Sequence, residues 1–286
     1  PLKVYDFIYA LLNQAILLPI CADSQDTALT IFSTLNNRGL PLSDADIFKA
    51  KIYNNLKDNE KEEFISQWKA LEKEATEAQE SIQQLFYYYM FYLRAKENDV
   101  SSTTPGVRKY YSGNKSERLF EPDLMKGLKT VLNLWKVVNT NQDIPEEDWD
   151  NNAKIRKALD TSYPNEYWKY PVIIYYLSHR NREDFNTEFL LFLNKLIEEL
   201  MTRFLLFPTI NAVKSDIMKL NAKIINDPHP MFDFREIDKS LLEERIRIPH
   251  RNIVRMLLKC YAYNHQEQLL PDNWQIEHIL PQKWQE

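Results

Sequence analysis

The sequence predicts a mainly α-helical protein, built as a bundle of several helices. Only 4 of its 286 residues are glycine, far below the roughly 7% of an average protein, so tight turns and hairpins have little support. Apolar residues recur at helical spacing along most of the chain. Hydrophobic residues make up 44% of it, which is enough for a sizeable core.

Composition and charge exclude several classes of protein. No stretch reaches the ~18 uninterrupted apolar residues of a membrane helix, so no membrane or secretory role is expected. The net charge of -5 argues against a broad nucleic-acid-binding surface, and any such contact must be local. Cys21 and Cys260 lie in apolar stretches and indicate buried free thiols of a cytoplasmic protein.

The first part of the chain predicts a strand followed by a helix, a turn and a second helix. Residues 15–22 (AILLPICA) form a continuous apolar run without helical period, as in a buried strand. Helical spacing over residues 27–35 ends near Gly39, which suits a left-handed helix cap. Ser43 and Asp46 then form a capping-box pattern in front of the second helix.

The middle of the chain predicts further helices. Over residues 64–92, apolar side chains alternate at steps of four and three, the seam of one long helix of roughly 40 Å. Residues 98–117 contain half of the glycines and predict a mobile loop or a subdomain boundary. Other helical stripes follow Pro122, span residues 167–177, start at Phe189 and cover residues 252–263, with an irregular connection over residues 226–236.

A candidate for chemistry stands near the C-terminus, in the run IEHILP (residues 276–281). In phosphodiester hydrolysis, a histidine can deprotonate the attacking water while a neighbouring carboxylate helps to hold a divalent metal. Glu277 and His278 supply both groups. Adjacent side chains of a strand point to opposite faces, so the two divide these roles only if the chain turns there, which Pro281 allows. The alternative is an ordinary structural Glu-His pair.

This run resembles the opening of the HNH (ββα-metal) nuclease motif, whose usual form is Asp-His-Ile-x-Pro. The resemblance implies that His278 is the general base. It implies that Glu277 replaces the usual aspartate as the metal-binding carboxylate, with Mg²⁺ or Mn²⁺ as the metal. The later Asn and the final His or Asn of the motif would follow Glu286. We therefore expect a truncated motif in a fragment that is inactive by itself and holds no cofactor.

A second stretch strengthens this resemblance. Residues 31–56 are similar to the end of the ParB-like N-terminal domain of GmrSD-type modification-dependent (type IV) restriction endonucleases and their relatives. In that family this stretch, a helical spacer and IEHILPQ occur in the same order. The resemblance implies three parts: the end of a small α/β ParB-like domain (1–58), a helical domain (59–270) and the first strand of the nuclease motif (271–286).

The function implied for the parent protein is that of an HNH DNA endonuclease of prokaryotic anti-phage defence, which restricts foreign, modified DNA. DNA is then the expected partner, and a homo-oligomer is left open. The family's Asp-Gly-Gln-Gln-Arg motif, associated with nucleotide binding and hydrolysis, does not occur in this sequence. NTP binding is therefore expected only from an N-terminal domain outside this sequence.

Two further groups of residues could contact a nucleotide or DNA. The first is Asn36-Asn37-Arg38-Gly39, because a helix end followed by a helix start presents free backbone groups and a guanidinium. The second is a basic helix face next to the motif, made of Arg245, Arg247, Arg251, Arg255 and Lys259.

Each group also has a structural explanation. The first is a helix cap with a solvated arginine, and the second is the solvated side of an amphipathic helix. The alternative for the whole chain is a non-enzymatic helical scaffold or a nucleic-acid-sensing module, in which Glu277 and His278 are structural.

Overall fold

The computed structural model describes residues 2–16, 21, 27, 31, 43–140, 153–271 and 273–277. These residues form α-helices and two short 3-10 helices, with no β-strand among them, which confirms the mainly α prediction. The chain divides into two compact units, Pro1–Ile47 and Phe48–Glu286. The predicted three-part division stays a prediction, and most of the strand expected over 15–22 lies outside the described residues.

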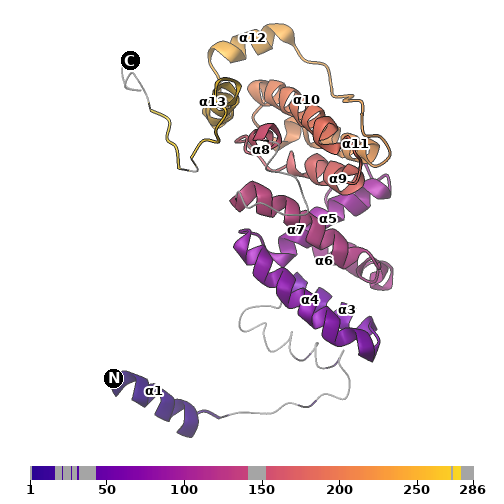
Figure 1. Cartoon of the computed structure of the whole chain (residues 1–286), viewed down its shortest axis with the longest axis vertical. Coiled ribbons are helices and arrows are strands. Elements are labelled where there is room, and N and C mark those ends of the chain that lie inside the picture. The colour runs from indigo at the N-terminus through magenta and orange to yellow at the C-terminus, as the bar shows by residue number, and fades with distance from the viewer. Residues whose placement is uncertain are drawn as a thin grey trace. The chain divides into compact units, whose positions relative to one another are not determined.

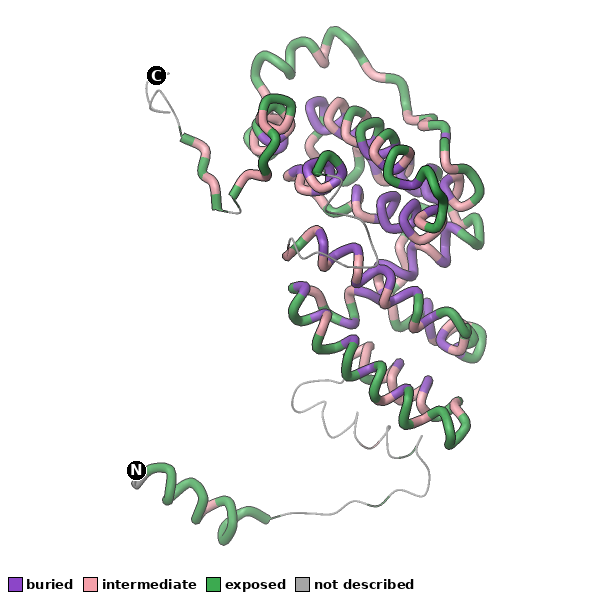
Figure 2. Tube along the Cα trace, in the orientation of Figure 1, coloured by how far each residue is buried: buried purple, intermediate pink, exposed green. Residues whose placement is uncertain are grey.

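The first unit contains helix α1 (Leu2–Asn13) and the beginning of α3 (Asp44–Asn55). Nearly all of α1 is exposed, including its large apolar side chains (Figure 2). The capping box at α3 is confirmed. The backbone N–H of Ser43 donates to the Asp46 carboxylate, and the Asp46 N–H donates to Ser43 Oγ, both at 3.2 Å. These reciprocal bonds fix where α3 begins.

The prediction of buried thiols is wrong for Cys21, which is exposed, while Cys260 is half-buried. An apolar stretch buries a thiol only where another element covers it. Ile16, in the same stretch, is 94% exposed. The apolar neighbours of Cys21 in sequence therefore do not place it in a core.

The second unit is a stack of helices that runs from α3 and α4, through α5 and α7, to α9, α10 and α11, with α12 and α13 beyond α10 (Figure 1). Their bounds are α4 (Asp58–Glu77), α5 (Ile82–Lys96), α6 (Val107–Ser112), α7 (Leu124–Thr140), α8 (Ala153–Leu159), α9 (Lys169–His179), α10 (Phe185–Leu206), α11 (Lys214–Ile224), α12 (Lys239–Arg247) and α13 (Arg251–His265), with 3-10 helices η1 (Asn114–Leu119) and η2 (Ile210–Ala212). The helical stripes predicted after Pro122, over 167–177, from Phe189 and over 252–263 correspond to α7, α9, α10 and α13.

Helices α5 and α9 occupy the centre of this unit. Helix α5 contacts α4, α6, α7, α9 and α11, and α9 contacts α5, α7, α10 and α11. Both are apolar on almost every side, as a helix must be when other helices surround it. Aromatic rings join them, since Phe91 of α5 stacks on Tyr170 of α9 with ring centroids 3.6 Å apart.

The single long helix predicted over residues 64–92 is wrong, because the chain breaks between α4 and α5. Gln79 adopts a left-handed conformation with φ of 57°, and Ser81 Oγ accepts from the Gln84 N–H at 3.1 Å to start α5. The apolar seam nevertheless stays buried. The two helices pack together, with the Trp68 and Phe86 rings 6.1 Å apart.

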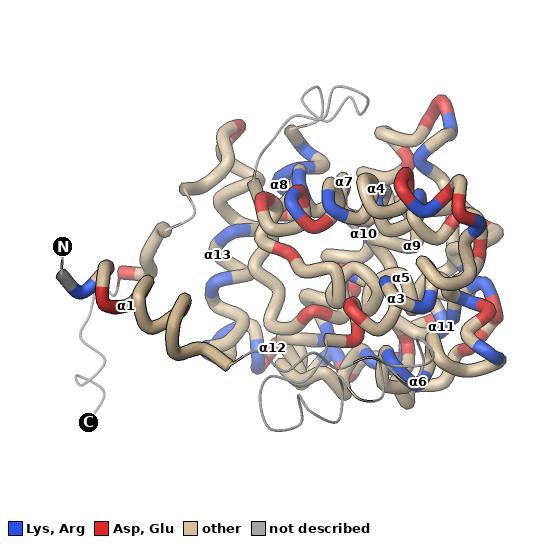
Figure 3. The backbone as a smooth tube through the Cα atoms, turned by 90° about the horizontal axis from the view of Figure 1, so that it is seen from below, with Lys and Arg blue, Asp and Glu red and all other residues tan. Residues whose placement is uncertain are grey.

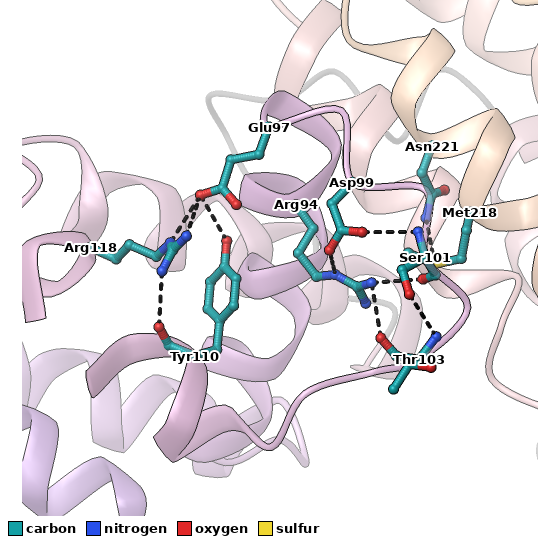
Figure 4. Close-up of polar contacts among 9 residues, drawn as sticks. All are labelled: Arg94, Glu97, Asp99, Ser101, Thr103, Tyr110, Arg118, Met218 and Asn221. Atoms are coloured by element: carbon teal, nitrogen blue, oxygen red, sulfur yellow. Dashed lines mark hydrogen bonds and ion pairs between the residues drawn. The ribbon is translucent and has the colours of Figure 1, made fainter. Parts of the chain in front are cut away.

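Residues 98–106 form the expected irregular loop, and α6 and η1 follow it; side chains and backbone groups of this stretch are hydrogen-bonded to α5 (Figure 4). The fully buried Arg94 donates through Nε to Asp99 Oδ2 at 2.7 Å, and through Nη2 to the carbonyls of Ser101 and Thr103 at 2.7 and 3.2 Å. Tyr111 of α6 is buried and donates its hydroxyl to the Phe86 carbonyl at 3.0 Å. Glycine and serine content indicated irregular backbone, but it does not measure how tightly a loop is held.

Gly127 provides a test of how closely α5 and α7 pack. A Cβ at this position would lie 2.3 Å from a carbon of the Tyr89 ring, which is itself buried. We expect Gly127→Ala to lower the free energy of unfolding by about 1–2 kcal/mol, because overpacking outweighs the gain in helix propensity. Chemical denaturation measures this. The matched control is Gly106→Ala, where a Cβ meets nothing within 4 Å, and we expect a change below about 0.5 kcal/mol. A neutral Gly127→Ala would contradict the close packing.

Candidate functional site

The nuclease-like run is described only as far as Glu277, whose side chain is exposed. His278 lies outside the described residues, and so do Asn36, Asn37, Arg38 and Gly39. The structure therefore places the carboxylate of the expected site and the chain that leads to it. The relation between Glu277 and His278 stays a prediction.

The chain that leads to Glu277 leaves the end of α13 and contacts this helix at two points (Figures 1 and 3). The Leu270 N–H donates to the hydroxyl of Tyr263, near the end of α13, at 3.2 Å. Four residues later, the Trp274 carbonyl accepts from Arg255 Nη2, near the start of α13, at 2.6 Å. Later residues of the segment thus contact earlier residues of the helix, and the motif is carried back toward the beginning of α13.

Arg255 makes two different contacts with the same residue. Besides the hydrogen bond to the Trp274 carbonyl, its guanidinium carbon lies 4.3 Å from the centre of the Trp274 ring. A turn helps to present that ring, because the Trp274 N–H donates to the Pro271 carbonyl at 3.3 Å. Both Arg255 and Trp274 are half-buried. The sequence suggested a DNA contact for Arg255, whereas the structure shows it holding the segment that precedes Glu277.

Lys259 is also engaged within the protein. Its side chain is 10% exposed, and its Nζ lies 2.7 Å from the Asp160 carbonyl oxygen and 2.9 Å from Asp160 Oδ2. The Tyr263 hydroxyl donates to the same carboxylate. Asp160 directly follows α8, so these contacts fasten α13 to the end of α8. The sequence offered no sign of this pairing because Asp160 and Lys259 are far apart along the chain.

The remaining basic residues of the predicted face, Arg245, Arg247 and Arg251, are exposed. They lie at the end of α12 and the start of α13, the end of α13 toward which the motif segment returns. His250 caps α13, since its Nδ1 accepts from the Asn252 N–H at 3.2 Å. The five basic residues therefore separate into three exposed arginines and two side chains that fasten α13 and the segment after it.

A second polar site lies where the turn between α4 and α5 meets α7 and α9. A cavity of about 580 Å³ is lined there by Gln79, Glu80, Ser81, Gln84, Tyr88, Asn139, Glu166 and Lys169. Lys169 Nζ donates to the Tyr88 hydroxyl at 3.0 Å and to Glu166 Oε1 at 3.1 Å, and Asn139 Nδ2 donates to Glu80 Oε1 at 3.3 Å. These contacts join α5, α7 and α9 at one point.

Burial raises the pKa of the Glu80 carboxyl above its ordinary value, although the Lys169 ammonium opposes that change. A carboxyl with a raised pKa in a cavity is a candidate acid or base. Here its neighbours already satisfy it, so the site is explained as a polar network that ties three helices together. It contains none of the residues expected to act on DNA.

A divalent metal, implied by the nuclease resemblance, does not have a complete set of ligands among the described residues. Glu277 supplies one carboxylate, and no group of three or more His, Cys, Asp or Glu side chains in the described part of the chain could hold a metal ion. A metal at Glu277 would need further ligands from other residues. Among the described helices, none is both long and apolar enough to cross a membrane.

No family model, curated protein or solved structure matches this chain. Fold and site together define the protein only as mainly α-helical, with α13, the last helix among the described residues, followed by a segment that carries an exposed carboxylate at Glu277.

The network around Glu80 predicts a pH-dependent effect on stability. Because its pKa is raised in the folded state, the fold favours the protonated carboxyl, and stability is lost as pH rises from about 4.5 through the raised pKa. We therefore expect Glu80→Gln to leave the melting temperature almost unchanged at pH 4 and to raise it at pH 7. Thermal melts across this range measure the effect. Exposed Glu62→Gln is the control, and the same pH trend in that variant would refute the assignment to Glu80.

Proposed function

We propose that this chain is the helical part of an HNH DNA endonuclease of prokaryotic anti-phage defence, which cuts foreign, modified DNA. The observation that carries the proposal is the order of two motifs: residues 31–56, then a helical spacer, then IEHILPQ. The helical fold of residues 43–140 and 153–271 is consistent with the spacer. If Glu277 and His278 were only a structural pair, there would be no reason for residues 31–56 to resemble the same family.

The proposed chemistry assigns His278 as the general base that removes a proton from the attacking water. Glu277 is proposed to contribute a carboxylate ligand to a divalent metal, whose remaining ligands would come from the rest of the HNH motif. Exposure of Glu277 supports this assignment, because a carboxylate already neutralised by an internal partner would be a poor ligand. Any NTP is proposed to bind an N-terminal domain and not these helices.

The proposed DNA contacts are Arg245, Arg247 and Arg251, which are exposed at the end of α13 toward which the motif segment returns. Guanidinium groups suit phosphate oxygens because they donate in a planar fork. Arg255 and Lys259 are left out because their charged groups are held by Trp274 and Asp160. The proposed DNA contact is therefore limited to these three arginines next to the motif. A small contact agrees with the net charge of -5, which argues against a broad nucleic-acid-binding surface.

The first test is cleavage. In a protein whose chain continues through a complete HNH motif, we expect Mg²⁺- or Mn²⁺-dependent cutting of modified DNA and a loss of at least ~100-fold with His278→Ala. The 286-residue chain alone should not cut. Gel assays with plasmid substrates measure both outcomes. Full activity in His278→Ala, or robust cutting by the 286 residues, would refute the role given to the motif.

The second test concerns DNA affinity. We expect Arg245→Glu/Arg247→Glu/Arg251→Glu to weaken DNA binding at least ~10-fold and to reduce the slope of log K against log salt by up to about 3, since each phosphate contact contributes roughly 0.9. Fluorescence anisotropy at several salt concentrations gives both values.

The matched control applies the same change of charge at exposed lysines of α4 and α5, in Lys69→Glu/Lys73→Glu/Lys96→Glu. That variant should keep most of the affinity and the slope. Equal losses in the two variants would mean that only net charge matters and that the three arginines form no DNA site.

A non-enzymatic helical scaffold is the second candidate. It is favoured by the internal use of Arg255 and Lys259, which shows that part of the basic face serves the fold. A scaffold predicts that Glu277→Gln and His278→Ala change stability or partner binding but no reaction. The cleavage assay separates the two functions.

A further inference from the structure

We propose that Arg255 is a positioning residue, which clamps Trp274 against α13 and thereby sets where Glu277 stands. The contact itself is independent of the function proposed above, and its consequence for catalysis rests on that function. The clamp lies three residues before Glu277. Because an extended chain spans at most about 3.5 Å per residue, Glu277 cannot be farther than roughly 10 Å along the chain from the clamped residue.

Two properties of an arginine side chain are used at once in this contact. The guanidinium lies over the indole ring, with its central carbon 4.3 Å from the ring centre, while Nη2 donates to the Trp274 carbonyl at 2.6 Å. A lysine could supply the charge but not the flat face together with the fork of donors. The contact therefore fixes both the side chain and the backbone of Trp274.

The same segment is fastened at two earlier points. The buried Lys157 of α8 donates to the Gln266 carbonyl, and the Tyr263 hydroxyl accepts from the Leu270 N–H at 3.2 Å. A segment held at residues 266, 270 and 274 has a defined course. The last of these points is the nearest to Glu277, three residues before it.

Helix α13 is a firm support for such a clamp. Next to Arg255 in the helix, Ile253 and Met256 are each 1% exposed, and α13 packs on α10. Lys259 joins the helix to Asp160 after α8. The arginine therefore projects from a surface that is fixed to the core of the unit, and the motif is held to that core through Arg255.

The proposal excludes a direct phosphate contact for Arg255. The exposed Arg251, one helical turn earlier, is the residue placed to meet DNA, and the two arginines should respond differently to mutation. Removing Arg255 should change the rate of the chemical step, and removing Arg251 should change affinity.

The first measurement needs no nuclease activity. Hydrogen–deuterium exchange of the 286-residue chain compares wild type with Arg255→Gln, Arg255→Lys, Trp274→Ala and Trp274→Phe, and uses Arg251→Gln as the control. We expect exchange of the N–H at position 274, which donates to the Pro271 carbonyl, to become at least ~10-fold faster in Arg255→Gln and Trp274→Ala. Trp274→Phe should retain most of the protection because it keeps a ring, Arg255→Lys should retain only part, and Arg251→Gln should match wild type.

The second measurement uses the protein with a complete HNH motif. Arg255→Gln and Trp274→Ala should lower single-turnover cleavage by up to roughly 100-fold, as expected when a catalytic group is displaced, with DNA Kd within about 2-fold of wild type. Arg251→Gln should raise the DNA Kd, because Arg251 is one of the proposed phosphate contacts.

The outcomes separate the two proposals. Unchanged exchange in Arg255→Gln overturns the clamp, and so does a loss of DNA affinity that Arg255→Lys fully restores, because charge alone would then suffice. Faster exchange with normal cleavage overturns the positioning role. If exchange responds as expected but wild-type protein never cuts DNA, the proposed function fails, and the contact only stabilises the segment after α13.

Discussion

The burial of α5 and α9 on nearly all sides is the constraint on which the rest of the second unit depends. A helix with apolar side chains around its whole circumference is stable only when other helices cover it. The surrounding helices supply that cover: α4, α6, α7 and α11 around α5, and α7, α10 and α11 around α9. Large aromatic rings fill much of the space between them, which makes the spacing of the helices sensitive to single atoms, as the approach of Gly127 to Tyr89 shows.

Polar side chains of the second unit mainly connect one segment to another through hydrogen bonds. Arg94 leaves the central helix α5 and holds the irregular chain around Ser101, so that a segment with few regular hydrogen bonds is still tied to the core (Figure 4). Lys169 joins α9 to Tyr88 of α5, and Asn139 joins α7 to Glu80 in the turn before α5. Lys259 does the same for α13 at Asp160. In each case a polar side chain fixes one segment relative to another more definitely than apolar packing does, because hydrogen bonds are directional.

The function proposed for the chain depends on the last of these connections. Helix α13 is anchored to the helical core, and the segment that carries Glu277 is anchored to α13 through Arg255. The exposed arginines at the start of the helix are then free to serve a different purpose from Arg255, although the sequence presents them as one basic face. A nuclease requires these two roles to be separate. Catalysis needs the motif in a fixed position, while attraction to DNA phosphates tolerates some freedom of the arginine side chains.

The sequence by itself determined the helical class, the approximate positions of α3, α7, α9, α10 and α13 and the capping box at Ser43, because these depend on local periodicity and on groups a few residues apart. It also provided the motif around Glu277 and the resemblance built on it. Tertiary structure alone decided that residues 64–92 form two packed helices and that Arg94 and Tyr111 tie residues 99–111 to α5. It likewise decided that Arg255 and Lys259 face Trp274 and Asp160. The physical reason is that a charged stripe looks the same in sequence whether water, DNA or another part of the chain neutralises it, and only folding brings the distant partner into contact.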